Sequence, residues 1–135
     1  MLNLLRLSFL PKSTDLGLLT LRMGLGLTML LLHGWGKLMN FSTMAPTFLP
    51  VFGLPSNVSL GLCIFAEVGC SILLILGLFT RLAALSLSIN MAVAFFIAHA
   101  GAFTGPKPGE LAFIYLIGYV TLLVAGGGRF STDRS

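Results

Sequence analysis

Residues 60–78 read LGLCIFAEVGCSILLILGL, an apolar run in which Glu67 is the one acidic or basic side chain. A helix of this length crosses the roughly 30 Å hydrocarbon core of a bilayer. A carboxylic acid near the middle of a membrane helix is costly, so such residues usually face the protein interior and serve a function. The run therefore predicts a membrane helix that carries a buried acidic residue.

The composition of the whole chain agrees with this prediction. Of the 135 residues, 56% are hydrophobic and only 9% are charged, whereas soluble proteins carry about 25% charged residues. The net charge is +4, but the eight Lys and Arg residues are scattered and form no basic face for nucleic acid. We expect a single membrane domain, residues 1–135, whose main partner is the lipid bilayer, with no nucleic-acid partner.

Four apolar segments, separated by turn signals, predict an all-α, four-helix up-down bundle in the membrane. Residues 1–14 contain Arg6 and Pro11 and are too short to span, so we expect them to lie on the membrane surface. Residues 40–59 combine three prolines with several aromatic residues, which predicts a loop or short helix that folds over the bundle as a lid. The predicted spans are residues 16–38, 60–78, 82–100 and 111–125.

The distribution of positive charges predicts the orientation of the bundle. Five basic residues fall on the side shared by both termini, and two fall on the other side. Both termini are therefore expected in the cytoplasm, and the proline-rich segment outside. The five are Arg6, Lys12, Arg81, Arg129 and Arg134, and the two are Lys37 and Lys107.

Ionisable residues of all four predicted spans reach a similar membrane depth. Counting about 1.5 Å per residue from the cytoplasmic edge places His33, His99 and Glu110 at roughly 24–26 Å. Glu67 comes out at roughly 18–20 Å, and Lys37 lies above the group. If the spans pack as a bundle, these side chains form one polar site in its outer half.

Three interpretations of this cluster remain open. Its imidazoles and carboxylates could form a proton relay or bind a quinone headgroup, or they could bind zinc or non-haem iron. Alternatively, Lys37 pairs with Glu110 at the interface and His33 bonds a backbone carbonyl. Because no HxxxH or CxxC spacing exists, we assign no metal ligands. The candidate catalytic residues are Glu67 and His33, and the candidate cofactor-binding residues are His33, Lys37, Glu67, His99 and Glu110.

Other buried polar residues also have structural interpretations. Glu67 could be a protonated carboxyl group that joins helices through Asn90 or Ser71. The depth of Arg22, about 9 Å from the cytoplasmic edge, favours a side chain that extends to the lipid headgroups. Cys63 and Cys70 of the same span are interpreted as small packing residues, with redox-active thiols as the alternative.

Several stretches together resemble the DoxX family of small bacterial and archaeal membrane proteins. They are LRMGLGLTMLLLHGWGKL (21–38), AEVGCSILLILGLFTRLAAL (66–85) and GGGRFSTDR (126–134). The resemblance implies a four-helix bundle in the cytoplasmic (inner) membrane and an association with quinone-linked oxidoreductases. On the family pattern, His33, Lys37, Glu67 and Arg81 match the recurring polar residues.

Two hypotheses of function follow. In the first, the protein is a subunit or component of a quinone-linked redox system, with quinone as its cofactor and a redox protein as its partner. In the second, it is a non-catalytic membrane scaffold or a carrier of a small solute. The chain lacks a haem ligand pair, a flavin fingerprint and an iron–sulfur cysteine set, so whether it is an enzyme stays undecided. Self-association into a homo-oligomer is also left open.

Overall fold

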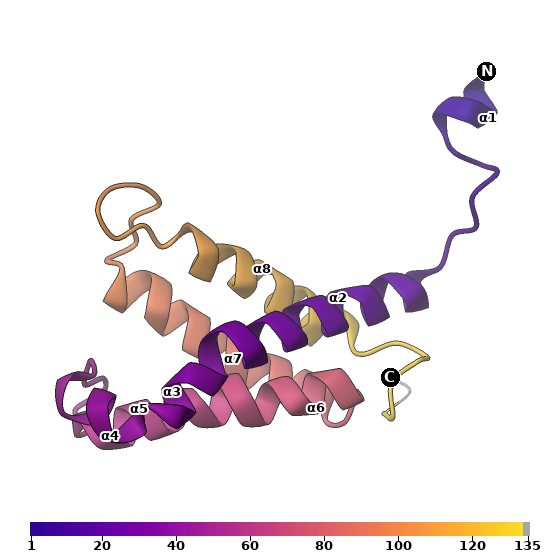
Figure 1. Ribbon diagram of the computed structural model, residues 1–135. Helices are drawn as coiled ribbons and strands as arrows, with labels where there is room; N and C mark the ends of the chain where they lie inside the picture. Colours follow the sequence, from indigo (N-terminus) through magenta and orange to yellow (C-terminus); the bar gives the residue numbers. More distant parts are fainter. Residues whose placement is uncertain (134–135) are drawn as a thin grey trace.

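The computed structural model describes residues 1–133, which fold into α-helical, π-helical and 3-10 segments joined by turns (Figure 1). The first long helix comprises α2 (Thr14–Met29), η1 (Leu30–Gly34) and α3 (Trp35–Met39), and the second comprises α5 (Ser56–Ile64), η3 (Phe65–Cys70) and α6 (Ser71–Leu76). The third comprises α7 (Thr80–Val93) and η4 (Ala94–Ala98), and the fourth is α8 (Glu110–Ala125). The short segments are α1 (Leu2–Leu5), α4 (Phe41–Met44) and η2 (Ala45–Thr47).

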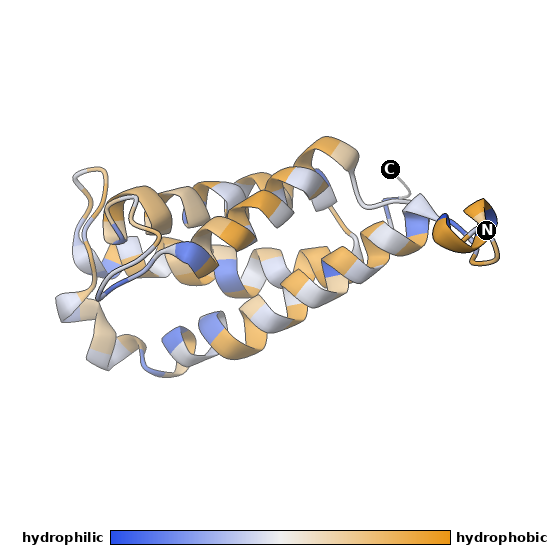
Figure 2. Cartoon of the chain, turned by 90° about the horizontal axis from the view of Figure 1, so that it is seen from above, coloured by the Kyte–Doolittle hydropathy of each residue, from blue (hydrophilic) through white to orange (hydrophobic). Residues whose placement is uncertain are grey.

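These helices confirm the all-α class and make the protein a helical membrane bundle. The helices over Thr14–Met39, Ser56–Leu76 and Thr80–Ala98 are long and apolar enough to cross a bilayer, and Glu110–Ala125 is a shorter apolar helix. Figure 2 shows apolar residues along all four helices. Each helix exposes large hydrophobic side chains, for example Leu31, Leu62, Leu82 and Ile114. In a membrane, lipid would cover these exposed hydrophobic side chains.

Local sequence explains where the helices begin and end. The Ser13 side chain accepts a hydrogen bond from the backbone N–H of Leu16 and caps α2. Pro55 precedes α5, where a missing N–H costs nothing. Gly77 ends α6 in the left-handed conformation, with φ of 69°, which glycine adopts without steric cost.

The bundle core lies where α7 packs along α8 and where α2 packs along α6. Its largest fully buried apolar side chains come from all four long helices: Met29, Leu74, Leu87, Tyr119 and Leu122. By contrast, α1 is fully exposed and lies apart from the bundle (Figure 1). Its expected position on the membrane surface stays a prediction.

The N-terminal segment and the segment after α8 lie at the same end of the bundle, and residues 40–55 and 99–109 lie at the opposite end (Figures 1 and 2). The four long helices therefore alternate in direction, which is the predicted up-down arrangement. Arg134, one of the basic residues that predict the orientation, lies outside the described residues. Which end faces the cytoplasm stays a prediction.

The segment after α8 folds back over this end of the bundle and surrounds the side chain of Arg22. The guanidinium group donates hydrogen bonds to the carbonyl oxygens of Leu74, Gly127 and Phe130 at 2.9, 3.2 and 3.1 Å, with a longer contact of 3.4 Å to Ile75. Arg22 is 1% exposed. The expectation that it extends to lipid headgroups is therefore wrong, because backbone carbonyls inside the protein satisfy its donors.

Asp133 fastens the same segment to the start of α7. Its two carboxylate oxygens accept hydrogen bonds from the backbone N–H groups of Phe79 and Thr80 at 2.8 and 2.7 Å. Partial burial raises the pKa of Asp133, but the hydrogen bonds from Thr80 and Phe79 and the charge of Arg22 outweigh this effect. Its pKa therefore lies below the ordinary value of 3.8.

This lowered pKa predicts a pH-dependent contribution to stability. Because the unfolded chain binds the proton more readily, the stabilisation is complete above the unfolded pKa and is lost as the pH falls through the lower folded value. Asp133→Asn keeps one acceptor but no charge, so it should cost about 1 kcal/mol at neutral pH, as a weakened helix cap does. Thermal unfolding in detergent should then show that Asp133→Asn loses less stability below about pH 4 than the native protein does. Equal losses in the two proteins would contradict the assignment.

Candidate functional site

The carboxylate of Glu67 is the centre of the candidate site. It accepts hydrogen bonds from the Lys37 ammonium group at 2.6 Å, the Asn90 amide at 2.9 Å and the Cys63 thiol at 3.0 Å. Glu67 is only 3% exposed, and its bond with Lys37 is an ion pair. All three neighbours donate, which is the environment of an ionised carboxylate rather than of a protonated one.

The first three long helices each contribute to this cluster. Lys37 lies on α3, Glu67 on η3 and Asn90 on α7, while Cys63 lies one turn before Glu67 on the same helix. Gly34 allows the first two helices to come this close, because a Cβ atom there would lie 2.9 Å from the backbone of Glu67. A larger residue at position 34 would therefore separate Lys37 from Glu67.

The π-helical segments gather around the cluster. His33 belongs to η1 and Glu67 belongs to η3, while η4 ends one residue before His99. A π-helical turn is rare and occurs frequently at functional sites, because it rotates the following side chains relative to a regular α-helix. Within residues 1–133, each π-helical segment thus carries or adjoins a residue singled out from the sequence.

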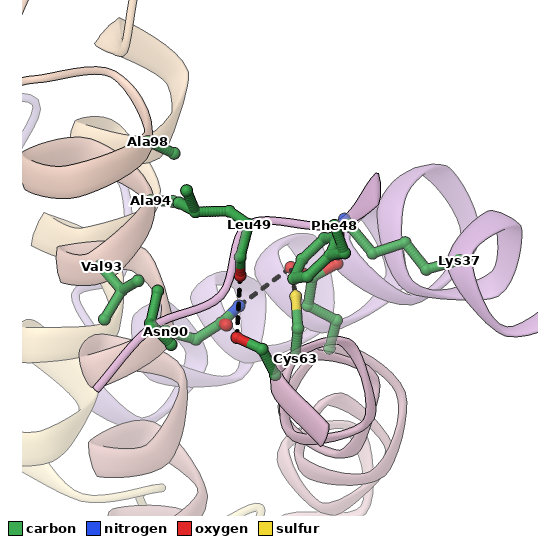
Figure 3. A pocket seen from close by; sticks show the side chains of 11 residues that line it. Lys37, Phe48, Leu49, Cys63, Asn90, Val93, Ala94 and Ala98 are labelled. Atoms are coloured by element: carbon green, nitrogen blue, oxygen red, sulfur yellow. Dashed lines mark hydrogen bonds and ion pairs between the residues drawn. The ribbon is translucent and has the colours of Figure 1, made fainter. Parts of the chain in front are cut away.

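Two cavities lie on either side of the ion pair. Cavity A has a volume of about 220 Å³ and is lined by both polar and apolar residues. The polar ones are Lys37, Ser59, Cys63, Glu67 and Asn90, and Phe48 is among the apolar ones. Cavity B has a volume of about 270 Å³. Lys37, Glu67 and Ala94 line both cavities. The ion pair is therefore part of the wall between them. Figure 3 shows Lys37 reaching towards cavity A from one side and Asn90 from the other.

Both histidines lie at cavity B. His33 packs edge-on against the Tyr115 ring, with ring centroids 5.7 Å apart, and both side chains line the cavity. His99 lines it too, and its Nδ1 lies 3.0 Å from the backbone oxygen of Lys107. The structure thus brings four residues of the sequence-derived set around one cavity. They are His33, Lys37, Glu67 and His99.

Glu110 is not part of this arrangement. It is the first residue of α8, its side chain is exposed, and it lines neither cavity. The alternative in which Lys37 pairs with Glu110 is wrong, because the Lys37 ammonium group binds Glu67. Counting residues gave similar depths for the two carboxylates, but depth alone does not say towards which neighbour a helix face points.

Three residues contribute to the site in ways that the sequence analysis does not predict. Asn90 was considered only as a structural partner of Glu67, although an amide inside an apolar span is itself a signal of a polar contact. Cys63 was interpreted as a packing residue, yet its thiol donates to Glu67. Ser59 had no assigned role; its hydroxyl donates to the Leu49 carbonyl at 2.9 Å and holds the proline-rich segment over cavity A.

The described residues offer no built metal site. Among residues 1–133, His, Cys, Asp and Glu side chains nowhere form a group of three or more that could hold a metal ion. The polar groups at Glu67 are instead hydrogen-bond donors around one acceptor.

The chain is similar in sequence to known proteins. Residues 17–100 match the model of the DoxX family. A relative from Haemophilus influenzae, described as an uncharacterized protein, is 36% identical over 111 residues, which cover 78% of this chain and 81% of the relative. No solved structure matches the chain.

Proposed function

The chain belongs to the DoxX family of membrane proteins, and on that premise we propose that it is a quinone-binding component of a membrane redox system. The observation that carries the proposal is the Lys37–Glu67 ion pair, with its buried carboxylate, in the wall between two cavities. A buried ion pair is a weak source of stability, whereas ionisable groups inside a membrane usually serve a function.

Cavity A suits the headgroup of a quinone. The two ring carbonyls of a quinone accept hydrogen bonds, and Lys37 and Asn90 are donors on the wall of this cavity. Phe48, Leu49 and Val51 supply apolar surface for the ring, which is the usual combination in small-molecule sites. Lys37 and Asn90 bind the headgroup in this proposal, and the proline-rich segment excludes water from it.

Cavity B suits the delivery of protons. Reduction of a quinone to a quinol takes up two electrons and two protons. Glu67 can pass a proton between the cavities because it lines both, and His33 and His99 can exchange protons in cavity B. The electrons come from a redox partner protein, since the chain carries no recognised redox centre of its own. Glu67 and His33 are thus the proposed catalytic residues.

The position of the Lys37–Glu67 ion pair between cavities A and B also favours a second candidate function, a carrier for a small polar solute. A solute could occupy cavity A and then cavity B if the Lys37–Glu67 ion pair opened between them. Flux of a small anion or cation into proteoliposomes, abolished by Lys37→Gln, would favour the carrier.

We further propose that the bundle lies in the cytoplasmic membrane with both termini in the cytoplasm, because basic residues are concentrated at that end. One added cysteine at a time, at Ser8 or at Ser42, tests this orientation. Both positions are exposed, and they come before and after the first long helix in the chain. In intact cells, a membrane-impermeant thiol reagent should label Ser42→Cys and not Ser8→Cys. The native chain supplies the background from Cys63 and Cys70.

Fluorescence of the purified protein tests quinone binding directly. Trp35 is the single tryptophan of the chain and lies two residues before Lys37 on α3. Quinones quench indole fluorescence at short range, so titration with the tail-less 2,3-dimethoxy-5-methyl-benzoquinone should give saturable quenching. Lys37→Gln should raise the dissociation constant about tenfold, which corresponds to one lost charge-assisted hydrogen bond.

Lys107→Gln is the matched control, because Lys107 is exposed and its side chain lines neither cavity A nor cavity B. Its titration should coincide with that of the native protein. Quenching that never saturates, or that Lys37→Gln and Lys107→Gln leave equally unchanged, would count against the quinone site.

A further inference from the structure

A third hollow opens on the side of the bundle, between the second and third long helices. This side groove has a volume of about 240 Å³, and its apolar lining includes Phe52, Leu62, Phe65 and Ile89. Leu62, Phe65 and Ile89 are 53%, 59% and 53% exposed. In a membrane bundle, these outward-facing side chains meet the hydrocarbon of the bilayer.

The side groove borders cavity A. The two share four lining residues, which are Ser59, Cys63, Asn90 and Val93. The groove side of this boundary is largely apolar and faces lipid, and the cavity side holds the Lys37–Glu67 ion pair. Ser86, which also lines the groove, already donates its hydroxyl to the Leu82 carbonyl within its own helix, so this hydroxyl is not a free donor.

The proline-rich segment covers cavity A from the end of the bundle. Phe48, Leu49 and Val51 line this side of the cavity, and the Ser59 hydroxyl holds the Leu49 carbonyl at 2.9 Å (Figure 3). This segment thus lines cavity A on the side nearest the end of the bundle, whereas the side groove borders the cavity on the side that faces lipid.

We propose that the side groove holds the hydrocarbon tail of the ligand whose headgroup lies in cavity A, and that this ligand enters from the bilayer between α5 and α7. The ligand class is an amphipathic quinone with an apolar chain. A molecule with this shape places its hydrogen-bonding head at Asn90 and Lys37 and its chain against Leu62 and Ile89. The inference rests on the proposed quinone site and adds the tail and the route.

The test compares two probes on variants of the groove. One probe is the tail-less 2,3-dimethoxy-5-methyl-benzoquinone, and the other is the same ring with a decyl chain. Ile89→Phe fills the groove, because Ile89 lines it without lining cavity A. We expect Ile89→Phe to raise the dissociation constant of the decyl probe about tenfold and to leave that of the tail-less probe unchanged.

Ile117→Phe is the matched control, because Ile117 is also 53% exposed but lies on α8, away from the groove. It should change the affinity for neither probe. Leu62→Phe, on the opposite wall, should repeat the selective loss if Ile89→Phe does not fold. Both groove variants are checked by their thermal unfolding in the same detergent.

The outcomes separate the tail site from the headgroup site. If the native protein binds the tail-less probe but the groove variants bind the decyl probe normally, the groove is not the tail site and the quinone site stands. An equal rise in the dissociation constants of both probes would also overturn the inference. The substitution would then disturb binding of the headgroup and not of the tail. If neither probe binds the native protein, the quinone site fails and the tail site fails with it.

Discussion

Replacing Arg22 by lysine is expected to destabilise the folded bundle by about 3 kcal/mol. The guanidinium group is buried and reaches backbone carbonyls of α6 and of the segment after α8 in different directions. A lysine has three donors at a single point and cannot reproduce the planar fork of arginine. At least one buried carbonyl therefore loses its partner, which costs about 1–3 kcal/mol for each group.

Arg81→Lys is the control for this substitution. Arg81 is exposed, and within residues 1–133 its side chain donates one hydrogen bond, from Nε to the Leu123 carbonyl at 2.8 Å. We expect it to cost less than about 1 kcal/mol, as exposed polar contacts do. Thermal or denaturant unfolding in one detergent measures both variants. If Arg22→Lys were as mild as Arg81→Lys, the buried role of Arg22 would be refuted.

The second large effect is expected at the Lys37–Glu67 ion pair, and it should be asymmetric. Lys37→Met removes the cation from a carboxylate whose side chain is 4% exposed, so a buried charge stays behind, at a cost of about 3 kcal/mol. Glu67→Gln leaves the Lys37 side chain, which is 21% exposed and can reorient towards water. That variant should cost about half as much.

A double-substitution cycle measures the coupling between the two residues. The Lys37→Met/Glu67→Gln protein should be more stable than the sum of the two single losses implies, by about 1–3 kcal/mol. Lys107→Met and Glu110→Gln form the control pair, because they make no ion pair with each other within residues 1–133. The losses of stability in this control pair should add. If those of Lys37→Met and Glu67→Gln also add, the ion pair does not form in the membrane.

The helices could be predicted from the sequence because burial in lipid demands long apolar runs that satisfy their own backbone. Residues 60–78 were predicted as a span, and the helix runs over Ser56–Leu76. Its earlier start follows Pro55, a start signal that we treated as part of a loop. The π-helical segments could not be predicted, since no residue type in Phe65–Cys70 distinguishes a π-helical turn from an α-helical one.

The candidate site was predictable in part. An acid in an apolar span identified Glu67, and depth counting grouped it with His33, Lys37 and His99, which line one cavity. The counting failed for Glu110 because depth carries no information about direction around the bundle. The role of Arg22 was missed for a different reason. Its acceptors belong to residues 74, 75, 127 and 130, and no local pattern links them to the first span.

The distance in sequence between Arg22 and its acceptors has a consequence for biosynthesis. Membrane helices are inserted in the order of their synthesis, so the first span enters the bilayer before residues 127 and 130 exist. Until then, the guanidinium group has to remain solvated by water or lipid headgroups, because an unpaired charge in hydrocarbon is costly. Residues translated long after the first span thus supply carbonyls that allow the first span to take its final position. A nascent chain that does not yet include these residues keeps a hydrated arginine in its first helix, so its membrane domain differs from the finished one.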